Sequence, residues 1–122
     1  MKPLPPTLRE KRRYLAFEVM SASKIRRDNF ISELQSASQS LLGDVGASQC
    51  DLWLINFDGT RGILRCARDK TTLARAVLAT IDKIERSNVS IRVLGISGTI
   101  KGVTEKFIER RGIPRDTFIE RM

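Results

Sequence analysis

The residues of this chain best suited to chemistry are cationic, and they are concentrated at its beginning. Five basic side chains lie in the first 13 residues: Lys2, Arg9, Lys11, Arg12 and Arg13. With Glu10 as the only acid there, this segment carries half of the chain's net charge of +8. Pro3, Pro5 and Pro6 keep the backbone extended and lack amide hydrogens, which excludes a helix or a central strand. An extended cationic arm suits a polyanion, most often nucleic acid; the alternative is a solvated tail that only aids solubility.

Two further arginines, Arg65 and Arg68, lie in a segment that predicts a strand. A planar guanidinium group can bind two phosphate oxygens at once, so both are candidates for contacts with a nucleic-acid backbone. Their spacing of three places them on opposite faces of a regular strand, so they do not form a single clamp. The alternative is an ion pair with Asp51 or Asp69.

The acidic and nucleophilic residues give no convincing catalytic site. The chain has no histidine, which excludes a nuclease with a histidine pair and any Ser-His or Cys-His hydrolase. Asp51, Asp58 and Asp69 could bind magnesium in a small nuclease. However, Asp58 is explained by a turn, and Asp69 lies where it can cap a helix, which leaves Asp51 alone. We therefore predict neither a catalytic residue nor a metal site.

The cysteine pattern and the hydropathy favour a soluble, cytoplasmic protein with no membrane association. Cys50 and Cys66 lie in apolar, strand-like runs and form no C-x-x-C pair, which is typical of free cysteines in a reducing compartment. A disulfide stays possible if the two runs are adjacent strands. No apolar run is long enough to span a bilayer, and no apolar stretch follows the basic start as in a secretory signal.

The elements that position these residues follow from periodicity. The predicted order is strand 13–19, helix 26–42 ending at Gly43, strand 46–57, an Asp58-Gly59 turn, strand 62–68, a helix from Thr71 or Thr72 to Asn88, strand 90–96 and a helix over 99–111. We therefore predict an α+β fold: a ferredoxin-like βαββαβ sandwich, as in RNA-recognition motifs, with a four-stranded antiparallel sheet and an extra C-terminal helix. The arm would comprise residues 1–13, and a single domain would comprise residues 14–122.

The predicted sheet lacks the aromatic platform on which RNA-recognition motifs stack bases. The third strand opens with Arg61-Gly62, as in those motifs, but isoleucine and arginine hold the aromatic positions. The chain has only seven aromatic residues, and four of them are predicted to lie in the core: Trp53, Phe30, Phe57 and Phe107. Recognition through phosphates and RNA shape is therefore favoured over the reading of single-stranded sequence.

The C-terminal segment has more apolar surface than a minimal domain requires. Apolar residues repeat at helical spacing over 99–111, and further ones follow beyond Pro114. This side must pack either on the open face of the sheet or on a partner protein. The residues expected at a partner interface are Val103, Phe107, Ile108, Ile113 and Phe118.

Three segments together resemble the archaeal ribonuclease P protein component 2 family. They are LPPTLREKRRYLAFEV over 4–19, GILRCAR over 62–68 and VLGISGTIK over 93–101, and they occur in the family's order. The resemblance implies a protein subunit of ribonuclease P, whose RNA removes the 5′ leader of precursor tRNA. It also implies that magnesium belongs to the RNA and that this protein binds no cofactor. The implied partners are ribonuclease P RNA and a TIM-barrel protein subunit, with possible self-association into a two-plus-two heterotetramer.

On this view the basic residues bind RNA phosphates. Lys101 follows the turn Ser97-Gly98-Thr99, near a predicted helix N-terminus that favours phosphate. The full set expected to bind RNA is Arg9, Lys11, Arg12, Arg13, Arg65, Arg68 and Lys101.

Two other functions stay open. One is a structural RNA-binding protein of another ribonucleoprotein, which composition alone does not distinguish. The other is a small ferredoxin-like, metal-dependent nuclease, in which Asp51 would be essential. A regulatory domain for a small metabolite is disfavoured, because a neutral ligand requires neither the basic arm nor a pI near 10.2.

Overall fold

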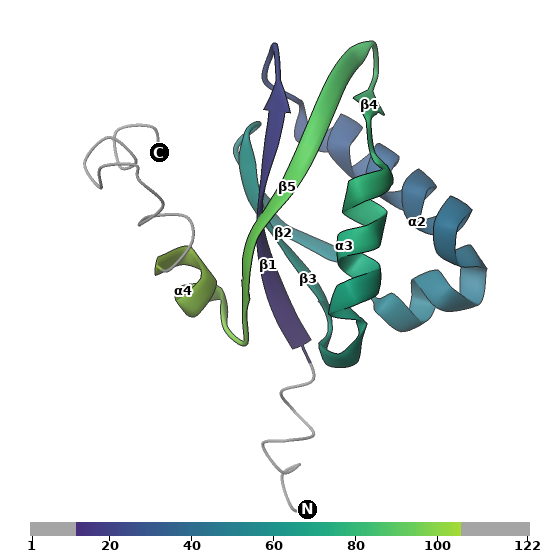
Figure 1. The fold of residues 1–122 in the computed structure, drawn as a ribbon, viewed down its shortest axis with the longest axis vertical. Helices are drawn as coiled ribbons and strands as arrows, with labels where there is room; N and C mark the ends of the chain where they lie inside the picture. The colour runs from purple at the N-terminus through teal and green to yellow at the C-terminus, as the bar shows by residue number, and fades with distance from the viewer. Residues whose placement is uncertain (1–11, 106–122) are drawn as a thin grey trace, which may run out of the picture.

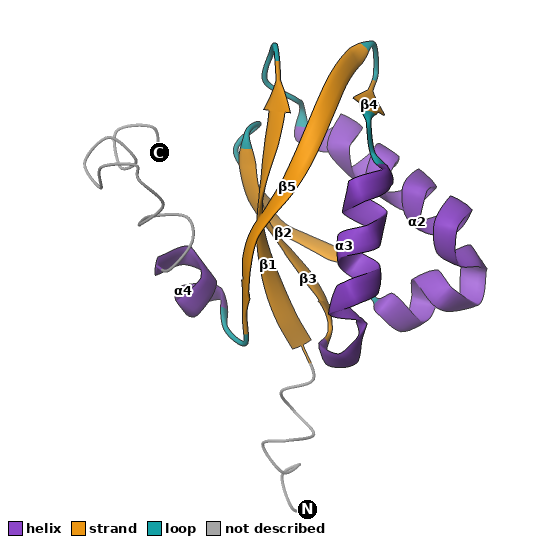
Figure 2. Cartoon of the chain, in the orientation of Figure 1, coloured by secondary structure: helices purple, strands orange, loops and turns teal. Residues whose placement is uncertain are grey.

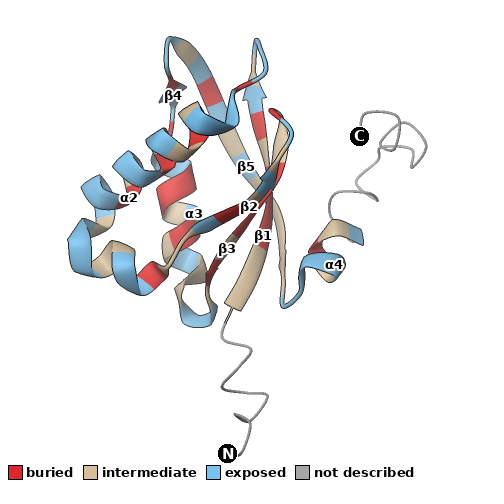
Figure 3. Ribbon diagram, turned by 180° about the vertical axis from the view of Figure 1, so that it is seen from behind, coloured by how far each residue is buried: buried red, intermediate tan, exposed pale blue. Residues whose placement is uncertain are grey.

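The computed structural model describes residues 12–105, which form a five-stranded antiparallel sheet with helices on both faces (Figure 1, Figure 2). The strands are β1 (Arg12–Ser21), β2 (Trp53–Phe57), β3 (Arg61–Ala67), β4 (Lys83–Ile84) and β5 (Ser87–Ser97), arranged in the order β2-β3-β1-β5-β4. The helices are α2 (Arg27–Cys50), α3 (Thr71–Thr80) and the short α4 (Ile100–Val103), and a 3₁₀ turn, η1 (Arg68–Lys70), precedes α3. Helices α2 and α3 lie on one side of the sheet and α4 on the other (Figure 3).

Strand β1 is the centre of the sheet, and its alternation is confirmed. Phe17 and Val19 pack in the main core under α2 and α3, whereas Ala16 packs on the opposite face. In the main core, the ring of Phe17 lies 5.2 Å from that of Phe30 and 6.0 Å from that of Phe57, measured between centroids. Residues of alternating polarity therefore give the sheet one face toward the main core and one face that is only partly covered.

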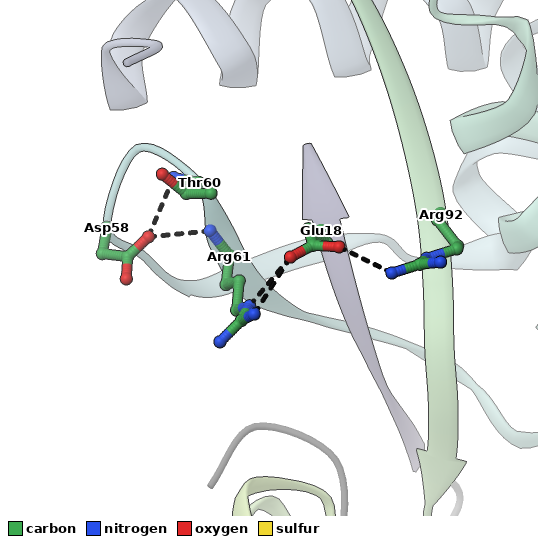
Figure 4. Close-up of polar contacts among 5 residues, drawn as sticks. All are labelled: Glu18, Asp58, Thr60, Arg61 and Arg92. Atoms are coloured by element: carbon green, nitrogen blue, oxygen red, sulfur yellow. Dashed lines mark hydrogen bonds and ion pairs between the residues drawn. The ribbon is translucent and has the colours of Figure 1, made fainter. Parts of the chain in front are cut away.

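The turn between β2 and β3 forms as its sequence predicts. Gly59 has φ of 98°, a value that glycine adopts without strain. The Asp58 carboxylate accepts hydrogen bonds from the backbone amides of Thr60 (2.8 Å) and Arg61 (2.7 Å) (Figure 4). Asp58 is therefore a turn residue.

The predicted strand over 46–57 is wrong in its first half, because the chain returns to helix after Gly43. Gly43 has φ of 75° and ψ of 177°, so the first helical segment of α2 ends there, as the sequence predicts. The following residues are mostly small or polar and complete another helical segment through Cys50, which ends at Asp51 with φ of 52°. Only Trp53–Phe57 remains for β2.

The four-stranded sheet is also wrong, because α3 ends at Thr80 rather than near Asn88. Ile81 is extended, and β4 pairs with the start of β5 through a tight turn in which Glu85 has φ of 57°. Ile81 and Ile84 are both buried. Their spacing of three suits a helix, yet the extended chain delivers both side chains to the same core. The result is a short fifth strand.

The two cysteines share a small core cluster as free thiols, although Cys50 lies at the end of α2 and not in a strand. Burial raises the pKa of the Cys50 thiol, and burial together with the neighbouring Cys50 raises the pKa of Cys66 to about 12. None of the helices over residues 12–105 is long and apolar enough to cross a membrane.

Neither thiol should react with Ellman's reagent at pH 8 in the folded protein, because the thiolate is the nucleophile and both thiols keep their protons. Absorbance at 412 nm should show release of two equivalents only after denaturant is added. Rapid labelling of the native protein would contradict this burial.

Candidate nucleic-acid interface

The partly covered face of the sheet carries a row of large polar and aromatic side chains near the start of β1. Trp53 of β2 is paired with Arg65 of β3, Arg65 with Tyr14 of β1, and Tyr14 with Ser97 of β5. Directly paired residues project from the same face of a sheet. The register therefore brings four residues that are distant in sequence into one line across four strands.

Asp51 joins this row to the start of β1. Its Oδ1 accepts a hydrogen bond from the indole nitrogen of Trp53 at 3.1 Å. Its Oδ2 lies 3.3 Å from an Nη of Arg12 and 4.0 Å from an Nη of Arg65. The Arg65 guanidinium carbon lies 5.4 Å from the centre of the Trp53 ring, which is cation–π geometry. We name Arg12, Asp51, Trp53 and Arg65 the tryptophan cluster.

A hollow of about 320 Å³ adjoins this cluster where β1 begins and β3 ends. It is lined by Arg12, Ala67, Arg68 and Asp69. Arg68 is exposed at the start of η1, past the end of the strand, so it does not share the row with Arg65. Counted with Asp51 and Arg65 of the adjoining cluster, this end of the sheet has three guanidinium groups against two carboxylates, a balance that favours an anion.

A second charged cluster lies farther along the same face (Figure 4). Glu18 accepts from Arg61 Nε at 3.1 Å through Oε2, which also lies 3.0 Å from an Nη of Arg61. Its other oxygen accepts from Arg92 at 2.9 Å. The Glu18 side chain is 15% exposed and that of Arg92 is 57% exposed, so the cluster has an excess positive charge at its outer side.

Helix α4 covers the face between these two clusters. Val103 is fully buried and packs with Ala16 and Ile63. Thr99 caps the helix, since its hydroxyl accepts a hydrogen bond from the Gly102 amide at 2.9 Å. The centre of the face, which would hold bases in an RNA-recognition motif, is therefore occupied by the protein itself.

Val103 was expected at a partner interface, and its burial corrects that expectation: its side chain supports the fold and offers no surface to a partner. The other residues expected there, Phe107, Ile108, Ile113 and Phe118, lie outside the described residues. Within α4, Ile100 is 41% exposed.

The structure separates the predicted RNA-binding residues into several groups. Arg12 and Arg65 meet at Asp51, as the ion-pair alternative for Arg65 predicted, and Arg68 joins them at the hollow. Arg13 donates to the backbone oxygen of Arg12 at 2.8 Å. Lys101 is exposed on α4, and Arg9 and Lys11 lie outside the described residues.

Two residues of this surface lie where the sequence pattern alone does not place them. Trp53 was assigned to the core, but its relative exposure is 57% because β2 is the edge strand. Glu18 received no role, although its position in the alternation of β1 places it on the open face. Over residues 12–105, no group of three or more His, Cys, Asp or Glu side chains could hold a metal ion.

Comparisons with known proteins agree on one protein family. A sequence model of the Rpp14/Pop5 family matches residues 13–108. A Methanosarcina mazei protein named ribonuclease P protein component 2 is 42% identical over 113 residues, which cover 93% of this chain and 97% of that protein. A Pyrococcus furiosus protein of the same name is 39% identical, with 91% and 94% covered.

The fold also resembles that of a chain in a cryo-EM structure of yeast ribonuclease MRP. The TM-score is 0.61, and the match covers 81% of this chain and 79% of that chain. The sequence identity is 14%, so this likeness concerns the fold alone.

Proposed function

The chain belongs to the Rpp14/Pop5 family, and from this membership we propose how it acts as a protein subunit of ribonuclease P. Its relatives named ribonuclease P protein component 2 match it over nearly their whole length, which supports a common role. We propose that it binds ribonuclease P RNA and thereby supports removal of the 5′ leader from precursor tRNA. We assign the fold to the ferredoxin-like topology, extended by the fifth strand.

The observation that carries the RNA contact is the convergence of Arg12, Arg65 and Arg68 at one end of the sheet. Strand β1 begins at the same end, directly after the arm residues Arg9 and Lys11. Several cationic side chains in one region of the surface can contact successive phosphates of a nucleic-acid backbone, and such contacts dominate RNA affinity.

Chemistry in this proposal stays with the RNA and its magnesium. Asp51 is engaged by two guanidinium groups, and Asp58 by the amides of its own turn. Neither carboxylate is therefore poised to coordinate magnesium at an active site of the protein. The subunit would act by holding the RNA in a productive shape and by reducing its charge repulsion.

We further propose that the end of the chain binds a TIM-barrel protein subunit and that two copies of each protein can assemble. Support comes from the exposed Ile100 of α4 and from the apolar pattern of the sequence that follows this helix. The complex would act in the cytoplasm on precursor tRNA.

The deciding experiment is cleavage of precursor tRNA by the cognate ribonuclease P RNA in modest magnesium. The reactions contain this protein, the barrel protein, both or neither. Stimulation that requires this protein, with no cutting when the RNA is omitted, is the expected result. Cutting by the protein alone would instead establish the metal-nuclease alternative. Absence of stimulation, with tight binding to another structured RNA, would favour a different ribonucleoprotein.

An Asp51→Asn variant distinguishes the RNA-binding proposal from a nuclease. The amide keeps an oxygen for the Trp53 indole but removes the charge that neutralises Arg12 and Arg65. Because an exposed ion pair is worth up to about 1 kcal/mol, RNA affinity should rise by up to about fivefold. Gel-shift titration measures this change, and cleavage by the reconstituted complex should persist. Loss of all cleavage, with binding intact, would contradict the assignment of chemistry to the RNA.

A further inference from the structure

Trp53 has a combination of exposure and rigidity that the phosphate contacts do not explain. It lies on the edge strand β2, and more than half of its surface is exposed. Asp51 fixes the indole nitrogen at 3.1 Å, and Arg65 lies over the ring at 5.4 Å. We propose that Trp53 is a stacking platform for one unpaired base of the RNA, an inference that rests on the proposed RNA-binding function.

The geometry suits stacking because the Trp53 side chain is already held in place, so binding a base costs it little conformational entropy. An aromatic ring held by a hydrogen bond and by a guanidinium group loses little conformational freedom when a base is placed against it. Any base has a π-face, so such a contact requires no particular sequence. The platform lies at the edge of the sheet, whereas α4 covers the centre of the same face.

The surroundings of Trp53 favour a nucleotide over a protein side chain. Its indole donates a hydrogen bond to Asp51, its ring lies under the Arg65 guanidinium, and Arg12 shares Asp51 with them. The strand of Arg12 is two positions from β2 in the sheet, which places it about 10 Å from the strand of Trp53. A base on the ring and a phosphate in the hollow beside Arg12 and Arg68 would then lie within the span of neighbouring nucleotides.

Trp53 is the only tryptophan of the chain, so its fluorescence reports this contact directly. The full-length protein is titrated with the cognate ribonuclease P RNA, and complex formation is followed in parallel by gel shift. The signal of a Trp53→Phe protein, prepared identically, is subtracted. Stacking should quench the fluorescence in step with complex formation. An abasic oligomer that carries the same number of phosphates as a ten-nucleotide strand should quench much less than that strand does.

Each outcome decides between the proposals. If a gel-shifted complex forms without quenching, the RNA-binding function stands and the stacking inference is overturned. If no complex forms at all, both are overturned. If the purified barrel protein changes the fluorescence in the absence of RNA, and RNA adds nothing further, Trp53 is a protein contact and the inference is wrong.

Substitutions give an independent measure. Trp53→Phe keeps an aromatic face and should bind RNA within about threefold of the original chain, whereas Trp53→Ala should bind about 5- to 150-fold more weakly. Val45→Ala is the matched control, because Val45 is 71% exposed on α2, away from the tryptophan cluster. It should leave RNA affinity unchanged. Thermal melting of all three variants checks the fold, and equal affinity of Trp53→Ala and Val45→Ala would overturn the inference.

Discussion

Replacing Phe17 with alanine is expected to lower the free energy of unfolding by about 3–5 kcal/mol. Phe17 is fully buried and stacks with Phe30 of α2 and Phe57 of β2. Those two rings also stack on each other, 4.8 Å apart. Alanine would leave a cavity beside the rings of Phe30 and Phe57, which belong to two different elements, so the surrounding structure could close it only in part.

Urea unfolding followed by circular dichroism measures this change. Met20→Ala is the matched control in the same strand, because Met20 is 47% exposed, and its effect should stay within about 0.5 kcal/mol. If Phe17→Ala cost less than 1 kcal/mol, the three-ring stack would not be the centre of the core.

The part of the fold that sequence predicted rests on strong local signals. Strand β1 alternates over most of its length, and the Asp58-Gly59 pair lies between two apolar runs. Each signal works over a few residues and agrees with the packing that the whole sheet requires. For this reason the central strands, the hairpin and both long helices were expected in the right order.

The predicted ends of elements were wrong where a helix and a strand would bury the same apolar residues. Residues 46–50 can be read as the beginning of a strand, but the segment after Gly43 buries Cys50 equally well as helix. Ile81 and Ile84 fit a helix face, but a two-residue strand also buries both. Local patterns do not distinguish these solutions, because the choice depends on which neighbouring strand offers an edge.

The sequence predicted the positive charge of the candidate site but not which side chains contact one another there. Composition and clustering indicated a polyanion as partner, and that inference needs no coordinates. The meeting of Arg12, Asp51 and Arg65 requires the left-handed backbone at Asp51 and the register of β1 with β3. Trp53 was misplaced because its hydrophobicity predicts burial, whereas its place on an edge strand exposes it.

Helix α4 links the fold to the mode of recognition. By burying Val103 against Ala16 and Ile63, it removes the middle of the sheet face from contact with RNA. What remains open is the tryptophan cluster, with its exposed ring, on one side of α4 and the cluster around Glu18 on the other. This division suits contacts with the backbone and shape of a folded RNA, to which a single stacked base can be added.

Removal of residues 1–11 is expected to weaken binding to ribonuclease P RNA by about 100-fold near 0.1 M salt. The deletion takes away Lys2, Arg9 and Lys11 but leaves β1 intact, since that strand begins at Arg12. Each lost phosphate contact should reduce the slope of log affinity against log salt by about 0.7 for single strands, so three contacts amount to about 2. Gel-shift titrations at several salt concentrations measure both quantities.

A variant with glutamine at Lys2, Arg9 and Lys11 separates the charge of the arm from its length. It keeps the prolines and every residue of the sheet, so its melting temperature should not change. If charge is the cause, this variant should reproduce most of the loss in affinity and in salt slope. A slope that matches the original chain in both variants would show that the arm makes no phosphate contacts. RNA affinity would then rest on the arginines around Asp51 and on Trp53, which the Asp51→Asn and Trp53→Ala variants test directly.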